Sequence, residues 1–116
     1  MRIAQRIGKV WILLSAFSVA ALFGQFDSAT LTGVVTDSTG KVIPAVVVKA
    51  ISEGTSVETS STTNAEGRYL FPSLRPGSYQ VAAAVTGFKQ FVASGVVLQV
   101  NQAARLDITL TIGAVT

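Results

Sequence analysis

Few side chains in this 116-residue chain could perform catalytic chemistry. Histidine and cysteine are absent, which excludes a Ser-His-Asp or Cys-His nucleophile, a thiolate or imidazole zinc site and a thioredoxin-like redox pair. A carboxylate pair could act as acid and base, but the acidic residues are scattered, mainly in turns or at outward strand positions: Asp27, Asp37, Glu53, Glu58, Glu66 and Asp107. We therefore predict no enzymatic activity, catalytic residue, metal site or cofactor, and we expect Asp37 and Glu66 to stabilise turns.

The net charge of +3 comes entirely from the first nine residues. The chain has nine Lys and Arg against six Asp and Glu, and Arg2, Arg6 and Lys9 account for the excess. Behind these residues the two signs balance, with six of each. We therefore predict no nucleic-acid partner. The glycines stand singly, as turn residues do, so a phosphate-binding loop is not predicted either.

An apolar run of 14 residues, Val10 to Phe23, follows these basic residues. It is shorter than the roughly 20 residues that a membrane span needs. Small residues at Ala21 and Gly24 offer cleavage sites, and the order of the three features is typical of a secretory signal peptide. We predict a helical signal segment over residues 1–24, a single domain over residues 25–116, and export to the periplasm or outer membrane. An uncleaved N-terminal anchor is the alternative.

The stretch from Thr63 to Phe91 carries the strongest structural pattern. Asn64 to Gly67 predicts a tight turn, because Asn can bond its own backbone and Gly accepts a positive φ. Pro76-Gly77 predicts a second chain reversal. Short strands are expected over Arg68–Phe71 and from Ser78 onward, and the second has one face made of Tyr79, Val81, Ala83 and Val85 before it ends at Gly87-Phe88.

Further strands are expected on both sides of this stretch, over Ala29–Thr36, Ala45–Ser52, Val57–Thr63, Phe91–Val100 and Arg105–Ile112. The run Val46 to Val48 predicts a central strand that is covered on both faces. The Ser/Thr-rich segment Val57–Thr63 predicts a poorly covered edge strand, and Gly95 predicts a bulge. In the last strand, alternation places four side chains in the core: Leu106, Ile108, Leu110 and Ile112.

Seven short strands, turn signals between them and no helical period behind the signal segment define the fold class. We predict an all-β protein, a seven-stranded antiparallel β-sandwich made of two packed sheets.

The ordered motifs of the central stretch resemble the carboxypeptidase regulatory-like domain, a transthyretin-like or prealbumin-like sandwich. The likeness rests on a turn followed by G-R-Y-x-F, then L-x-P-G-x-Y-x-V, then x-G-F, and it extends over roughly Ala29 to Ile112. The residues that carry it are Gly67, Tyr69, Phe71, Pro76, Gly77, Tyr79, Gly87 and Phe88. Within the family, the text is most similar to the domain that precedes the plug of Oar-like TonB-dependent outer-membrane transporters.

The resemblance implies a non-enzymatic accessory domain of the bacterial envelope, since metallocarboxypeptidase chemistry in the wider family belongs to a separate domain. We predict a protein partner, bound through the edge strand Val57–Thr63, and outer-membrane transport machinery is one candidate. A carbohydrate-binding module is the alternative that the carbohydrate-binding-like grouping of this fold implies. An orphan or truncated fragment without independent function is a third.

The aromatic rings bear on the carbohydrate alternative, because sugar-binding sandwiches stack sugars on exposed rings. At their alternating positions the rings are more typical of core or sheet-end anchors. Tyr69, next to the Gly67 turn, is the best candidate ligand contact. The other rings behind the signal segment are Phe26, Phe71, Tyr79, Phe88 and Phe91.

Overall fold

The computed structural model describes residues 27–113. The predicted signal segment and Phe26 lie outside the described residues. Within them the fold contains strands and turns but no helix, and hence no helix of the length and apolarity that a membrane crossing requires. The strands are β1 (Ala29–Asp37), β2 (Val47–Ser52), β3 (Glu58–Thr62), β4 (Arg68–Leu74), β5 (Gly77–Ala84), β6 (Phe91–Leu98), β7 (Ala103–Arg105) and β8 (Ile108–Leu110).

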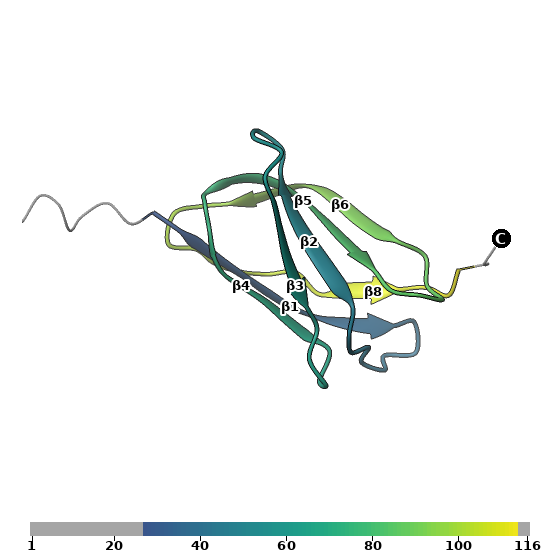
Figure 1. The fold of residues 1–116 in the computed structure, drawn as a ribbon. Helices are drawn as coiled ribbons and strands as arrows, with labels where there is room; N and C mark the ends of the chain where they lie inside the picture. The colour runs from purple at the N-terminus through teal and green to yellow at the C-terminus, as the bar shows by residue number, and fades with distance from the viewer. Residues whose placement is uncertain (1–26, 114–116) are drawn as a thin grey trace, which may run out of the picture.

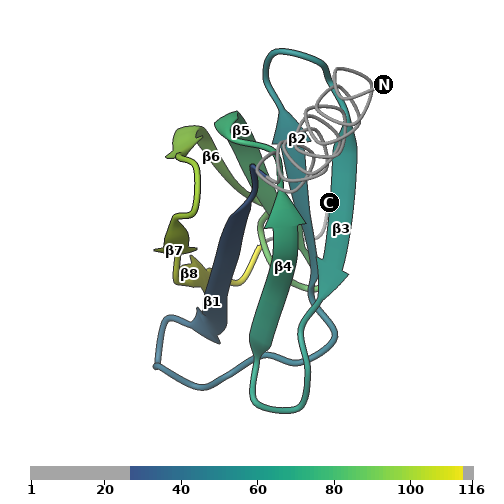
Figure 2. The same cartoon turned by 90° about the vertical axis from the view of Figure 1, so that its left-hand side faces the viewer.

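These strands form two four-stranded sheets that pack face to face, as Figures 1 and 2 show. The first sheet has the order β4-β1-β7, with β8 pairing β1 beyond β7, and the second has the order β3-β2-β5-β6. The predicted all-β sandwich is therefore confirmed. It has eight strands in the described residues, where the sequence predicted seven.

The extra strand arises because the predicted strand Arg105–Ile112 is divided. β7 and β8 both pair with β1, and both run parallel to it, whereas the sequence predicted antiparallel pairing throughout. Regular pairing ends at Leu110, and Ile112 forms only an isolated bridge with Phe88 and is 77% exposed. The prediction that Ile112 faces the core is therefore wrong, since no element covers it within residues 27–113.

The core lies between the sheets and is made by alternate residues of the strands. On β1, Leu31 and Val35 are fully buried, and Val81 of β5 faces them from the second sheet's side. Burying an aliphatic side chain of this size stabilises a fold by about 1.5–3 kcal/mol. The largest fully buried side chains are Phe71, Leu31, Leu98, Ile108, Leu110, Val35, Val46, Val48 and Val81.

β2 is an interior strand of its sheet, as predicted, but only one of its faces is covered. Val46 and Val48 are fully buried, whereas Val47 is 39% exposed. The prediction of cover on both faces is wrong because, in the part of the chain that the structure describes, the outer face of the second sheet carries no further layer.

The turn predicted over Asn64 to Gly67 forms as expected. The Asn64 side-chain oxygen accepts the N–H groups of Glu66 and Arg68, both at 3.0 Å, and Gly67 adopts a φ of 73°. In β6, Ser94 and Gly95 together stand opposite the single residue Gln80, and Gly95 adopts a φ of 69°. This is the bulge predicted at Gly95.

Candidate functional site

Tyr69 is a core residue. It is 2% exposed, its ring meets that of Phe71 edge to face at 5.9 Å between centroids, and its hydroxyl donates to the Leu106 carbonyl. Burial, with a smaller contribution from the Asp107 carboxylate, raises the pKa of the phenol, which therefore stays protonated as a donor. This placement offers no ring face to a sugar, so it argues against Tyr69 as a ligand contact.

Gly33 makes this arrangement possible. A Cβ at this position would lie 1.9 Å from the Leu106 carbonyl oxygen and 2.7 Å from the Tyr69 hydroxyl. Leu106 and Asp107 lie between β7 and β8, where the pairing with β1 is interrupted. Here the Leu106 N–H donates to the Thr32 carbonyl, and the Asp107 carboxylate accepts the Val34 N–H. The sequence analysis treated the glycines as turn residues and gave Gly33 no role of its own. A glycine inside an alternating strand is the signal for such a close approach.

The other residues of the central motif also have structural roles. Phe71 and Tyr79 are buried, and the Tyr79 hydroxyl donates to the Arg75 carbonyl at 2.6 Å. Gly77 and Gly87 adopt positive φ values of 151° and 92°, and the partly buried Phe88 packs against the core after the second of them. These positions shape the fold, and Tyr79 also lines the cleft beside β3 described below.

The carboxylates of Asp37 and Asp107 accept hydrogen bonds from neighbouring groups of the fold. Asp37 accepts the hydroxyl and N–H of Thr39 and the N–H of Lys41, and these bonds, the hydroxyl's first, hold its pKa below the usual range. The predicted turn role of Asp37 is thus confirmed. The Val34 N–H and then Arg105 lower the pKa of Asp107 in the same way.

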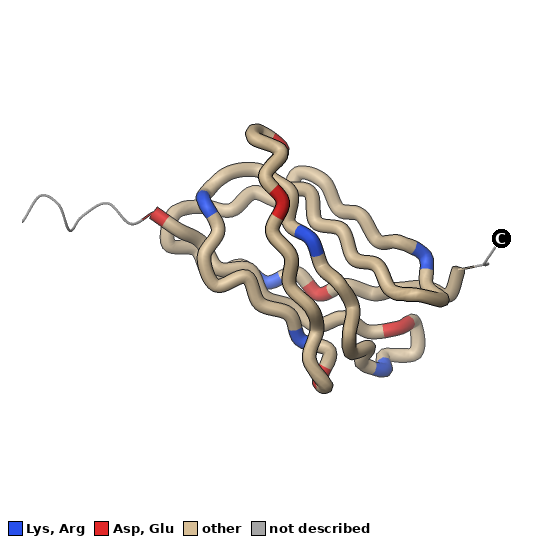
Figure 3. Tube along the Cα trace, viewed as in Figure 1, with Lys and Arg blue, Asp and Glu red and all other residues tan. Residues whose placement is uncertain are grey.

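The remaining charges do not gather into a centre. Figure 3 shows Lys, Arg, Asp and Glu scattered singly along the trace. Glu58 pairs with Lys49 at 3.1 Å, and Glu53 accepts the Ser78 hydroxyl at 3.0 Å and the Gly95 N–H at 2.8 Å. Among residues 27–113 no three acidic side chains are grouped as a metal ion would need.

β3 is the candidate interaction site. It lies at one end of the second sheet, as predicted for this segment, and four of its five residues are exposed. At the strand's ends, Ser52 donates to the Val57 carbonyl and Thr63 to the Val46 carbonyl, both at 2.9 Å. Hydrogen-bonded pairs alternate along an antiparallel ladder, so Thr59 directs its backbone toward β2. The residues whose backbone groups point to the free edge are Glu58, Ser60 and Thr62.

The side of β3 that faces the first sheet is also poorly covered. Thr59 stands opposite the buried Ala50 and therefore points inward, yet it is exposed, and the neighbouring Val57 is 62% exposed. β3 and β4 diverge here, as Figure 2 shows, and leave a cleft of about 620 Å³. Its lining includes Val57, Thr59, Leu74 and Arg75. The edge thus combines free backbone groups with a partly apolar hollow.

The described architecture, two packed β-sheets with an open edge and no catalytic cluster in residues 27–113, defines a prealbumin-type sandwich. Residues 30–111 match the sequence model of the carboxypeptidase regulatory-like domain, and the chain belongs to this family. The resemblance predicted from the central motifs is confirmed.

A curated relative places the chain more closely. Over 92 residues it is 34% identical to the TonB-dependent transporter Oar of Myxococcus xanthus, a match that covers 78% of this chain but only 8% of the transporter.

Solved structures share the fold at low sequence identity. One is a Bacteroides uniformis protein described as a candidate carbohydrate-binding protein, with a TM-score of 0.59 and 18% identity over 71% of this chain and 40% of that one. Another is catechol 1,2-dioxygenase of Acinetobacter radioresistens, with a TM-score of 0.59 and 11% identity over 78% of this chain and 53% of that one. At such identities the likeness concerns the fold alone.

Proposed function

We propose that this domain is a non-enzymatic accessory module of the bacterial envelope that binds a protein partner by strand addition at β3. The observation that carries the proposal is the free edge, where Glu58, Ser60 and Thr62 direct backbone donors and acceptors away from the sheet. An extended segment of another protein can complete such a ladder, and side-chain pockets next to it then supply specificity. The cleft beside Val57 and Thr59 supplies such a pocket.

The envelope context is supported by the similarity to a TonB-dependent transporter. Because the match covers 8% of that transporter, transport itself is not part of the proposal. Components of outer-membrane transport are the first partners to test. We also propose that residues 1–24 are removed on export. Mass spectrometry of the envelope fraction is expected to give an N-terminus near Phe26, and intact Met1 on a cytoplasmic pool would contradict export.

The edge is tested by proline substitution at neighbouring positions. Ser60→Pro removes an N–H that points to the free edge, so the domain should fold and lose its partner. Thr59→Pro is the matched control, because it removes an N–H of the β2–β3 ladder and should unfold the strand at a cost of about 3 kcal/mol. Ser60→Ala keeps the N–H and should bind like the wild type.

Binding is read out by a photoreactive amino acid at Glu58, irradiated in cells, followed by identification of the adduct. The adduct should form with Ser60→Ala and disappear with Ser60→Pro, and the purified partner should slow amide exchange at Ser60. An adduct that survives in folded Ser60→Pro would overturn strand addition. Micromolar binding of a neutral glycan by the purified chain would instead favour the carbohydrate-binding alternative.

A further inference from the structure

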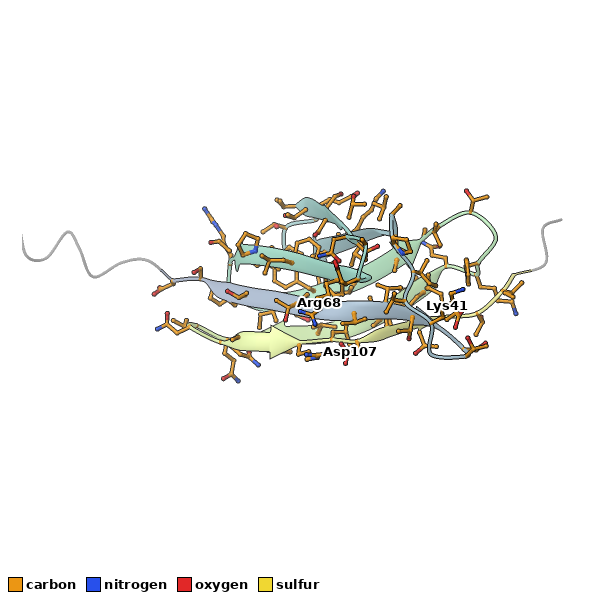
Figure 4. All side chains as sticks on the ribbon, turned by 90° about the horizontal axis from the view of Figure 1, so that it is seen from below. Lys41, Arg68 and Asp107 are labelled. Carbon is orange, nitrogen blue, oxygen red and sulfur yellow. The ribbon has the colours of Figure 1, made fainter. Side chains whose placement is uncertain are left out.

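A second hollow lies on the outer face of the first sheet. Its floor is formed by Thr32 and Val34 of β1, and Arg68 of β4 and Arg105 of β7 stand on its two sides. Its volume is about 560 Å³. Figure 4 shows Arg68 and Asp107 flanking β1. The groove extends to Ser61 and Thr62 of β3, but Ser60 is not part of its lining.

The strand register places both arginines on this face. Thr32 and Val34 alternate with core residues of β1 and therefore point outward. Arg68 pairs with Val34 on one side of β1, and Arg105 pairs with Thr32 on the other. Two strand spacings across and two residues along the sheet separate their Cα atoms by about 12 Å. A ligand seated over β1 can therefore reach both guanidinium groups.

Two side chains at the groove next to Arg68 have donors to offer. The Asn64 carbonyl oxygen already accepts two N–H groups, which leaves its NH₂ group to donate. The Ser61 hydroxyl oxygen accepts the Leu70 N–H at 3.3 Å, which leaves its O–H. The Asp107 carboxylate accepts the Val34 N–H and the Arg105 Nε–H.

Arg68 has the strongest unused donor. Within residues 27–113 its guanidinium forms no ion pair and no side-chain hydrogen bond. Arg105 bonds Asp107 only through Nε, at 3.1 and 3.2 Å, which leaves its two terminal nitrogens. Planar guanidinium donors match the two oxygens of a carboxylate.

We propose that this groove binds carboxylate side chains of an acidic, extended peptide segment, with Arg68 as the principal contact and Arg105 as the second. The apolar surface of Val34 and Leu70, which is 51% exposed, suits the methylene groups of Glu side chains. An acidic sugar would supply the same carboxylate, but the groove has no exposed aromatic ring for its pyranose face, since Tyr69 is buried. The proposal holds whether or not β3 is a binding edge.

The test titrates the full chain with two synthetic peptides, Val-Glu-Val-Glu-Val-Glu and its Gln counterpart, at low salt by calorimetry and NMR. The Glu peptide should bind and shift the amide signals of Thr32, Val34 and Arg68, and the Gln peptide should not. Arg68→Gln should weaken binding about tenfold, as expected for a hydrogen bond between charged groups. Lys41→Gln, at a cation that lines neither this groove nor the cleft beside β3, is the control and should leave affinity unchanged.

The outcomes separate this groove from the β3 edge. Ser60→Pro should bind the Glu peptide as the wild type does, even where it abolishes partner binding. Equal affinity for the Glu and Gln peptides, or equal effects of Arg68→Gln and Lys41→Gln, would overturn the proposal. Tighter binding of an oligogalacturonate than of the Glu peptide would overturn the peptide as the source of the carboxylate.

Discussion

The two flanks of the sandwich differ in how they treat polar groups. Where β1 meets β7 and β8, backbone groups at the break in pairing find partners: the Leu106 N–H donates to the Thr32 carbonyl at 2.8 Å and the Val34 N–H to the Asp107 carboxylate at 3.0 Å. On the opposite flank, β3 directs backbone groups away from the sheet and its residues are mostly exposed. On the first flank internal bonds close the break between β7 and β8, whereas β3 pairs with β2 alone within the described residues.

Side-chain type explains the difference. On β8 the inward positions are Ile108 and Leu110, which are 1% exposed and complete the core. On β3 the inward positions are Thr59 and Ser61, which are too small and polar to draw the two sheets together at this edge. The sandwich therefore opens where its sequence changes from aliphatic to Ser/Thr, and this is where interaction is proposed.

The largest expected effect is that of Gly33→Ala. The added methyl would lie 1.9 Å from a backbone carbonyl oxygen, so the β1–β7 and β1–β8 pairing would have to separate. We expect a loss of at least about 4 kcal/mol, at the upper end for single substitutions. Urea denaturation measures it, and Gly54→Ala, at a position with open space around it, is the control. A near-wild-type midpoint for Gly33→Ala would contradict the closed flank.

Truncating one side chain on each flank tests the contrast directly. Ile108→Ala leaves a cavity beneath β8 and should cost about 3 kcal/mol. Val57→Ala, at the open cleft, should change stability by no more than about 0.5 kcal/mol. Equal costs in chemical denaturation would mean that the cleft beside β3 is packed in solution.

The features of this contrast that depend on local chemistry could be predicted from the sequence. The Asn64 turn, the Gly95 bulge and the exposed β3 edge follow from residue types over a few positions, and all three were confirmed. The break at Leu106-Asp107 could not be predicted, because the pattern Arg105–Ile112 alternates perfectly. It depends on a parallel partner about 70 residues earlier in the chain and on the glycine that lets Tyr69 reach it.

The candidate sites show the same division. Alternation predicted an edge at β3, but it could not tell which N–H groups point outward, since that parity is set by pairing with β2. Arg68 and Arg105 are 37 positions apart in the sequence, and only the register on both sides of β1 places them on one face. Its position after a turn made Tyr69 a candidate ligand contact. Its burial depends on packing against other strands, which the local sequence does not show.

Tyr69→Phe sharpens the account of the closed flank by removing one hydrogen bond without changing the packing. The Leu106 carbonyl would lose the phenol as its donor, at a cost of about 1–2 kcal/mol. Thermal or chemical denaturation measures the loss. Gly33→Ala combined with Tyr69→Phe should still be strongly destabilised. The double variant lacks the Tyr69 hydroxyl, but the added methyl still clashes with the Leu106 carbonyl oxygen. Recovery in the double variant would show that the hydroxyl, and not the carbonyl, makes Gly33 necessary.

The smallest effect is expected from the charge of the Asp107 carboxylate, which accepts the Val34 N–H at the break in pairing. The pKa of Asp107 is held below its ordinary value by the Val34 N–H and by Arg105, so its ionised form favours the folded state. Its stabilisation is complete above the unfolded-state pKa near 3.9 and is lost as the pH falls through the lower, folded-state pKa. Because the side chain is 57% exposed, the contribution should stay below about 1 kcal/mol.

Asp107→Asn keeps an acceptor for Val34 but cannot ionise, so the stabilities of wild type and variant should differ most at pH 6 and converge toward pH 2. Asp37, whose pKa is also lowered, should leave a residual acid slope in Asp107→Asn that Asp37→Asn removes. A wild-type advantage over Asp107→Asn that stays constant from pH 6 to pH 2 would show that the carboxylate's charge does not stabilise this flank.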